Sequence, residues 1–283
     1  MPKQLSPWSK RSAAIGSILL VLSIFVACGD DGSDFSTRPS DGSSSSRAKS
    51  SSSLVNSSSS VTLATPCKTD STDTCEYGEL VDDRDGLFYK TVKIGDQVWM
   101  AENLNYAYLQ PTDELDSSSF CYNDSAEYCE KYGRLYTWGV AMDSSGTWSS
   151  NGKGCGYCAE CTPAYPVRGV CPEGWHLPSI DEWYTLFLAV GDSTLFGVKL
   201  KSTSGWRDGG NGTDAFGFSA LPAGYMRGNP IYSADSSCAH FWSSTTHGDN
   251  YMEYAQLCYD TDVAYQVIAT SKYEGKSVRC VKD

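Results

Sequence analysis

The chain has 283 residues, among them 34 acidic and 22 basic side chains, and a formal net charge of -12. Its 40% hydrophobic content excludes wholesale disorder, because that much apolar surface is enough to build a core. The negative charge argues against nucleic acid or an anionic membrane surface as the main partner, since both repel it. The 12 cysteines are typical of an oxidising compartment, where thiols pair as disulfides.

Residues 1–27 are predicted to be a lipoprotein signal peptide. They carry basic side chains and no acidic one, and their apolar stretch is too short to span a bilayer comfortably. The run Phe25-Val26-Ala27-Cys28 resembles a bacterial lipobox, in which the cysteine becomes the lipidated N-terminus. An uncleaved anchor helix is the alternative. With palmitate and other acyl chains on Cys28, the protein is expected in the cell envelope, outside the cytoplasm, on the outer membrane or the cell surface.

Residues 28–65 are predicted to be the lipidated cysteine followed by a flexible linker. Fifteen of residues 29–65 are serine, and Phe35 is the one aromatic residue among them. Such a stretch cannot bury enough apolar surface to offset the entropy lost on ordering. The segment therefore serves as a spacer between a membrane and a folded domain.

Residues 66–283 are predicted to form one disulfide-stapled domain, because no second linker interrupts them. The first regular pattern in this domain is an alternation of apolar residues over 87–94 and again over 97–100. Gly95-Asp96 separates the two runs, and this arrangement is typical of a β-hairpin.

The strongest helix prediction covers residues 179–190. Ser179 and Glu182 form a capping box at its start, and Gly191 stands where a C-terminal cap belongs. Residues 125–142 have apolar spacings that also allow a helix. Few helices and many short strands joined by long loops predict an α+β fold.

Seven short blocks follow one another in the domain: KIGDQVWMAENL over 93–104, YGRLYTW over 132–138, CPEGWHLPS over 171–179, KSTSGW over 201–206, GTDAFGFSALPAG over 212–224, FWSS over 241–244 and SVRC over 277–280. In this order they resemble the Fibrobacter succinogenes major paralogous domain, and the resemblance covers about residues 85–283. The resemblance implies an envelope or secreted protein. In such proteins this domain often follows a lipoprotein signal and a serine-rich linker. The family has no established biochemical function.

A wider similarity concerns the fold. The run GWHLP over 174–178, an amphipathic helix after it and a cysteine in the last strand are similar to C-type lectin-like domains. The similarity implies short twisted antiparallel strands, one or two helices, long loops and a Cys171–Cys280 disulfide that pins the helix beside the last strand. Formylglycine-generating enzymes share this architecture, but the context of their active-site cysteines is not matched, so the shared fold does not carry their chemistry over.

The remaining cysteines fall into local groups, although spacing alone cannot establish connectivity. Proximity suggests three pairs: Cys238–Cys258, Cys121–Cys129 and Cys67–Cys75. A further C-x-x-C-x-x-C cluster consists of Cys155, Cys158 and Cys161. A structural zinc site would need a fourth ligand, and a redox site would need a thiolate of low pKa, so a Cys155–Cys161 disulfide with Cys158 as a free thiol is the favoured interpretation.

No catalytic set is predicted, and no cofactor. The histidines are His176, His240 and His247, and nothing in the sequence organises a nucleophile, a base and an orienting carboxylate around them. His176 lies in the block before the capped helix and is interpreted as structural.

Ligand binding has more support from the sequence than catalysis has. Trp148 and Trp206 lie in polar Gly/Ser loops and are the predicted exposed platforms for sugar rings. Asp208, Asn211 and Asp214 lie in a glycine-rich loop whose oxygen ligands suit calcium. The alternative for that loop is a turn in which Asp214 caps the backbone, and this alternative is favoured, so no metal is predicted.

The predicted function is that of a membrane-anchored, outward-displayed lipoprotein with a non-catalytic recognition module for polysaccharide or another surface component. One alternative is a structural or assembly protein that binds envelope proteins. The other is an oxidoreductase of the formylglycine-generating type that uses the cluster at 155, 158 and 161.

Overall fold

The structure is a computed structural model that describes residues 61–109, 119–156, 162–191, 193–228, 231–247, 251–269 and 271–283. The predicted signal peptide, Cys28 and the linker up to residue 60 lie outside the described residues. The described residues belong to one compact unit. Within them, no helix combines the length and the apolar character that crossing a membrane requires.

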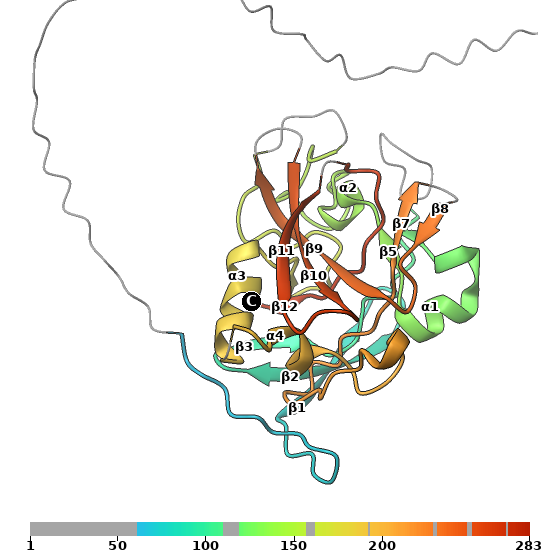
Figure 1. Cartoon of the computed structure of the whole chain (residues 1–283). Helices are drawn as coiled ribbons and strands as arrows, with labels where there is room; N and C mark the ends of the chain where they lie inside the picture. Colours follow the sequence, from blue (N-terminus) through green and yellow to red (C-terminus); the bar gives the residue numbers. More distant parts are fainter. Residues whose placement is uncertain are drawn as a thin grey trace, which may run out of the picture. The chain divides into compact units, whose positions relative to one another are not determined.

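Short strands dominate the described part of the chain (Figure 1). The strands are β1 (Tyr77–Asp82), β2 (Leu87–Ile94), β3 (Gln97–Met100), β4 (Ser119–Phe120), β5 (Leu135–Tyr136), β6 (Trp175–His176), β7 (Tyr225–Gly228), β8 (Ile231–Ser233), β9 (Cys238–His247), β10 (Tyr251–Cys258), β11 (Ala264–Ala269) and β12 (Val281–Lys282). The helices are α1 (Ala126–Tyr132), α2 (Trp138–Ala141), α3 (Ile180–Ala189) and α4 (Phe196–Leu200), with 3-10 turns at η1 (Tyr122–Asp124) and η2 (Arg207–Gly209).

The largest sheet has the order β1-β2-β3-β12-β6, and its neighbours pair antiparallel. Strands β2 and β3 form the hairpin that the sequence predicts, with Gly95 at a φ of +60° in its turn. Strand β12 is two residues long, and its Val281 pairs with Trp99 of β3 on one side and with His176 of β6 on the other. The end of the chain therefore lies inside this sheet and links β3 to the edge strand β6.

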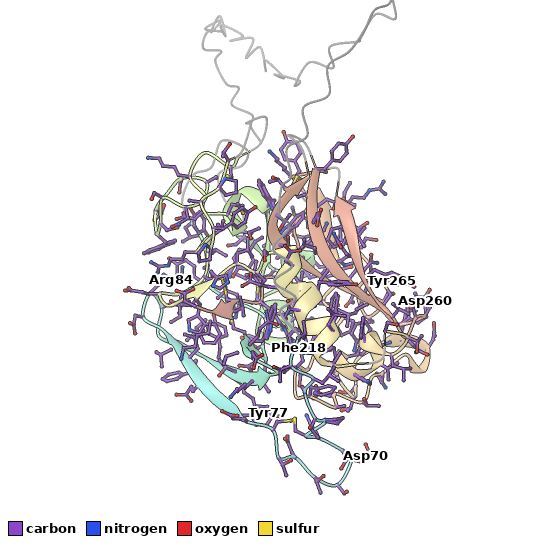
Figure 2. All side chains as sticks on the ribbon, turned by 90° about the vertical axis from the view of Figure 1, so that its left-hand side faces the viewer. Asp70, Tyr77, Arg84, Phe218, Asp260 and Tyr265 are labelled. Carbon is purple, nitrogen blue, oxygen red and sulfur yellow. A yellow bond between two sulfur atoms is a disulfide. The ribbon has the colours of Figure 1, made fainter. Side chains whose placement is uncertain are left out.

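A second sheet has the order β11-β10-β9, and α3 packs against its strands β9 and β10 (Figure 1). Helix α3 has the predicted capping box of Ser179 and Glu182, and Gly191 follows it at a φ of +86°. Trp183 on its inner face lies 4.7 Å from Trp99 and 5.4 Å from Phe241, measured between ring centroids. This aromatic cluster joins the two sheets, because Trp99 belongs to one and Phe241 to the other. Figure 2 shows Phe218, a further member, inside the body and Asp70 and Asp260 at its periphery.

The first described residues belong to the predicted linker and contact the body of the domain. Val61 and Ala64 pack against the aromatic core, and the Ala64 backbone N–H donates to the carbonyl of Ala189 at the end of α3 over 2.8 Å. Residues 61–65 are therefore held by the domain.

The prediction of an α+β, C-type-lectin-like fold is wrong. The described residues form mainly short strands in antiparallel sheets, and the longest of their few helices, α3, has 10 residues. Residues 125–142, whose spacing allowed one helix, divide into α1, β5 and α2. Gly133 ends α1 at a φ of +74°, and the close approach of Asn103 to it favours glycine at this position. Apolar spacing alone did not reveal this interruption.

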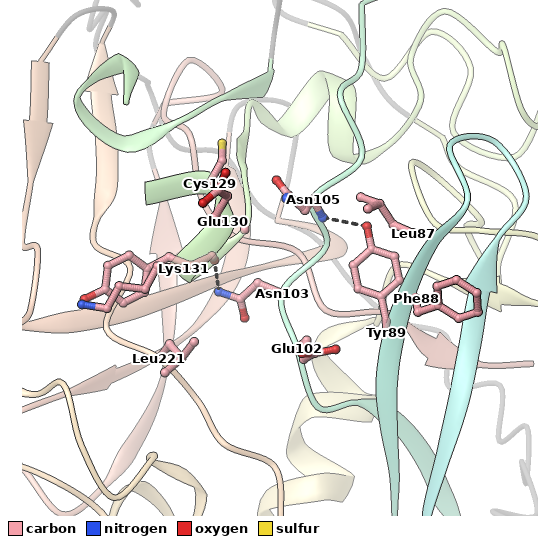
Figure 3. Close-up of a pocket in the computed structure, with 12 residues that line it drawn as sticks. Leu87, Phe88, Tyr89, Glu102, Asn103, Asn105, Cys129, Glu130, Lys131 and Leu221 are labelled. Atoms are coloured by element: carbon pink, nitrogen blue, oxygen red, sulfur yellow. Dashed lines mark hydrogen bonds between the residues drawn. The ribbon is translucent and has the colours of Figure 1, made fainter. Parts of the chain in front are cut away.

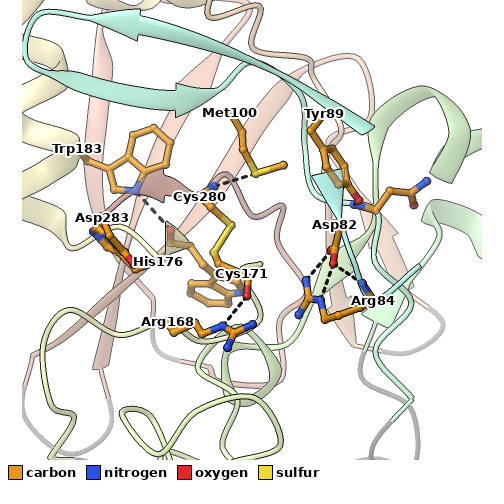
Figure 4. The surroundings of a disulfide bond; sticks show 12 residues. Asp82, Arg84, Tyr89, Met100, Arg168, Cys171, His176, Trp183, Cys280 and Asp283 are labelled. Atoms are coloured by element: carbon orange, nitrogen blue, oxygen red, sulfur yellow. Dashed lines mark hydrogen bonds and ion pairs between the residues drawn. A yellow bond between two sulfur atoms is a disulfide. The ribbon is translucent and has the colours of Figure 1, made fainter. Parts of the chain in front are cut away.

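Four disulfides lie within the described residues: Cys67–Cys75, Cys121–Cys129, Cys171–Cys280 and Cys238–Cys258. They coincide with four of the five pairs predicted from the sequence. Cys155 is also disulfide-bonded, whereas Cys158 and Cys161 lie outside the described residues. The Cys171–Cys280 bond joins the segments that precede β6 and β12, beside His176 and Asp283 (Figure 4).

Candidate functional site

A cleft of about 540 Å³ lies at the N-terminal end of α3. Its volume is in the range of pockets that hold small ligands, about 300–1,000 Å³. Three parts of the chain line it: residues 165–167, residues 176–182 around the start of α3, and Ser244 with Thr245 in β9.

Hydrogen bonds from backbone N–H groups join two of these parts, the start of α3 and β9. The Ile180 N–H at the start of α3 donates to Oγ1 of Thr245 over 3.0 Å. The Ser244 N–H donates to the carbonyl of Pro178 over 2.8 Å. Strand β9 therefore satisfies groups that the helix start leaves unpaired, and it fixes one wall of the cleft.

His176 lines the cleft and lies between two carboxylates. Its Nε2 lies 2.8 Å from Oε1 of Glu182, and its Nδ1 lies 2.7 Å from Oδ1 of Asp283. Burial lowers the pKa of the imidazole, but the hydrogen bonds to the two carboxylates outweigh it, so the pKa of His176 lies above its ordinary value. Both ring nitrogens are engaged, which fits the structural interpretation of this histidine and leaves no nitrogen for general-base catalysis.

An NMR titration of the His176 imidazole is expected to give a pKa above the ordinary 6.5. The stability that this contact contributes is then fully present below pH 6.5 and is lost as the pH rises through the folded-state pKa. Asp283→Asn removes one of the two negative charges and is expected to lower the pKa. A wild-type value below 6.5 would contradict the described geometry.

The cleft has an exposed aromatic ring and an exposed carboxylate at its rim, and a buried hydroxyl in its wall. Tyr165 is 54% exposed, and its hydroxyl donates to the backbone carbonyl of Ser244 over 3.3 Å, which orients the ring. Ser244 is wholly buried, and its Oγ has no hydrogen-bond partner among the described residues. Asp181 is exposed in the first turn of α3. An aromatic face, a hydroxyl and a carboxylate can together bind a polar ring without covalent chemistry.

A smaller cleft of about 170 Å³ lies between the β1–β2 hairpin and α1 (Figure 3). Phe88 on the hairpin is 63% exposed, and the neighbouring Tyr89 accepts a hydrogen bond from the Asn105 N–H over 3.0 Å. On the opposite side, the Asn103 amide donates to the carbonyl of Tyr132 over 2.7 Å. The volume is below the range typical of small-ligand sites, so the cleft at α3 is the better candidate.

The two tryptophans predicted to be exposed platforms are buried or half-buried in the structure. The prediction is wrong for Trp206, which is 5% exposed and whose Nε1 donates to Oγ of Ser202 over 3.0 Å in the core. Trp148 is half-buried, edge-on to Tyr106 with 5.9 Å between ring centroids. A polar loop sequence does not prevent burial of the tryptophan it carries, because packing so large an apolar ring stabilises the fold.

The calcium candidates are not brought together as a site. Asp208 is exposed and pairs with Arg207, and Oδ1 of Asn211 accepts a hydrogen bond from the Trp206 N–H over 3.1 Å. Asp214 is buried and accepts from the Ser219 N–H over 2.6 Å, in addition to its ion pair with Lys68. These side-chain oxygens have separate partners, so the loop is stabilised by local caps.

The other two histidines do not contribute to the cleft. His240 is buried between Tyr225 and Tyr254, and burial together with the charge of Lys276 lowers its pKa to about 3. The side chain of His247 lies outside the described residues.

Reasoning from the sequence missed Tyr165, Asp181 and Ser244. Ser244 lies in the block at 241–244, which marked it as part of a motif, and Asp181 lies next to a capping residue. Tyr165 lies in an irregular segment without periodicity, so no local signal distinguishes it.

Comparison with known proteins gives one match. The family model described as the Fibrobacter succinogenes major domain matches residues 92–282, which is more than half of the chain. No curated protein and no solved structure gives a match. These comparisons do not confirm the wider similarity to C-type lectin-like or formylglycine-generating domains.

Proposed function

The chain belongs to the Fibrobacter succinogenes major domain family, and on this premise we propose that it is a non-catalytic recognition module that binds polysaccharide at the cell envelope. In this proposal, lipid on Cys28 holds the chain to a membrane, outside the cytoplasm, and the serine-rich segment displays the domain outward. The lipobox-like run 25–28 and the many cysteines support this location.

The observation that carries the binding proposal is the exposed ring of Tyr165 at a cleft whose Ser244 hydroxyl has no partner. Sugar rings have C–H faces that pack on aromatic rings, and their hydroxyls pair with polar groups such as Ser244 Oγ. A buried hydroxyl without a partner costs free energy, about 1–3 kcal/mol, which a bound hydroxyl would recover.

Tyr165→Ala in the full chain is expected to weaken glycan binding about tenfold, the effect of about 1.4 kcal/mol. The measurement is a screen against plant and bacterial glycans, followed by titration calorimetry with the best glycan. Tyr184→Ala is the matched control, because Tyr184 is also 54% exposed but does not line the cleft. Binding of no glycan, or equal losses in both variants, would refute the proposal.

One observation favours the alternative of a protein that binds envelope proteins. Val81, Leu87 and Phe88 are exposed together on the β1–β2 hairpin, where Val81 pairs with Phe88 across the strands. Crosslinking in intact cells that returns specific protein partners, without glycan binding, would support this alternative. The oxidoreductase alternative has weaker support, because Cys155 is disulfide-bonded.

A further inference from the structure

The cleft at α3 carries net negative charge. Asp181 and Glu182 line it, and Asp283 is hydrogen-bonded to His176 in its lining. Burial raises the pKa of Glu182, but hydrogen bonds from His176 and Ser179 outweigh it and lower the pKa, so this carboxylate stays ionised. Among the described residues, no lysine or arginine lines the cleft. A ligand that carries carboxylates or sulfates would therefore meet repulsion.

The carboxylate of Asp181 is the acidic group that remains open to a ligand. Both oxygens of Glu182 are engaged, one by His176 and the other by Ser179. Asp181 accepts a hydrogen bond at its backbone carbonyl from Thr185, whereas its carboxylate has no partner among the described residues. Its position at the start of α3 also interacts favourably with the helix dipole, so its effects on stability and on binding must be measured separately.

We propose that the cleft takes an amino sugar with a free ammonium group, as part of a polysaccharide. The ammonium would pair with Asp181, and a protonated amine near Tyr165 would also be attracted to the ring face. The buried hydroxyl of Ser244 would meet a sugar hydroxyl. This inference rests on the proposed function and specifies the class of glycan for the same cleft.

The test compares two oligosaccharides of equal length by titration calorimetry with the full chain. One is a glucosamine hexamer with free amines, and the other is the fully N-acetylated hexamer, which is neutral. At a pH where the amines are protonated, the glucosamine hexamer is expected to bind about fivefold more tightly, the effect of about 1 kcal/mol from an exposed ion pair.

Asp181→Asn is expected to abolish this preference, because it removes the negative charge and keeps the size of the side chain. Asp181→Glu retains the charge at the helix start and is expected to restore most of the preference. Glu79→Gln is the matched control, because Glu79 is exposed on β1 and lies outside the cleft. Thermal unfolding of each variant separates a loss of stability from a loss of binding.

Three outcomes would overturn the inference. If the N-acetylated hexamer binds as tightly as the glucosamine hexamer, the amino-sugar class is wrong while the proposed glycan-binding function stands. If Glu79→Gln reduces the preference as much as Asp181→Asn, the amine is attracted only by the overall charge of the chain. If a hexalysine peptide binds as tightly and shows the same loss with Asp181→Asn, the cleft recognises ammonium groups irrespective of the sugar. Binding of no glycan at all would refute the proposed function itself.

Discussion

Replacing Cys171 and Cys280 together by alanine is expected to lower the free energy of unfolding by about 5 kcal/mol. The two residues are 109 positions apart. A disulfide that closes so long a loop strongly lowers the conformational entropy of the unfolded chain, which stabilises the folded state. Both cysteines are wholly buried, so alanine also leaves unfilled space in the core. Urea unfolding followed by tryptophan fluorescence measures the loss.

The double variant Cys67→Ala/Cys75→Ala is the matched control. These residues are 8 positions apart, and the same treatment of chain entropy gives a loss of about 2.5 kcal/mol. We therefore expect the first variant to lose about 2 kcal/mol more than the second. Equal losses would show that loop length does not determine the contribution of these disulfides.

Arg279→Met is expected to lower the free energy of unfolding by about 3 kcal/mol or more. The guanidinium is wholly buried, and it donates to Oδ1 of Asn103 over 2.8 Å and to the backbone carbonyls of Phe218 and Ser219. Its carbon lies 4.4 Å from the centroid of the Phe218 ring. Methionine keeps much of the volume but donates no hydrogen bond, so the buried acceptors lose their partner.

Arg279→Lys is expected to lose an intermediate amount, because lysine retains the charge but lacks the planar arrangement of donors. Arg207→Met is the control for removal of an arginine at the surface, where the ion pair with Asp208 is exposed. The control is expected to change the free energy of unfolding by less than about 0.5 kcal/mol. A similar loss in Arg207→Met and Arg279→Met, measured by urea unfolding, would contradict the role of the buried network.

Local patterns predicted the elements whose interactions are local. Strands β2 and β3 have the predicted bounds, since the alternation and the Gly95-Asp96 turn determine a hairpin over neighbouring residues. Helix α3 begins after the predicted cap, because Ser179 and Glu182 satisfy each other within one turn. The pairs Cys67–Cys75 and Cys121–Cys129 are each eight residues apart, so proximity was enough to suggest them.

Burial could not be predicted from the same patterns. Trp206 and Trp148 lie in polar loops, and a loop sequence does not show whether the fold covers the side chains it carries. The fold class also depended on distant pairing. Strand β12 is too short to be stable alone, and it forms only because β3 and β6 flank it.

The sequence by itself determined the hairpin, the capped helix, the family and the charge that argues against nucleic acid as a partner. The tertiary structure decided where the candidate site lies. Tyr165, Asp181 and Ser244 come from an irregular segment, a helix start and a strand, and they line one cleft because β9 is hydrogen-bonded to the beginning of α3. Contacts between residues so far apart depend on the packing of the whole domain, and no local pattern in the sequence encodes them.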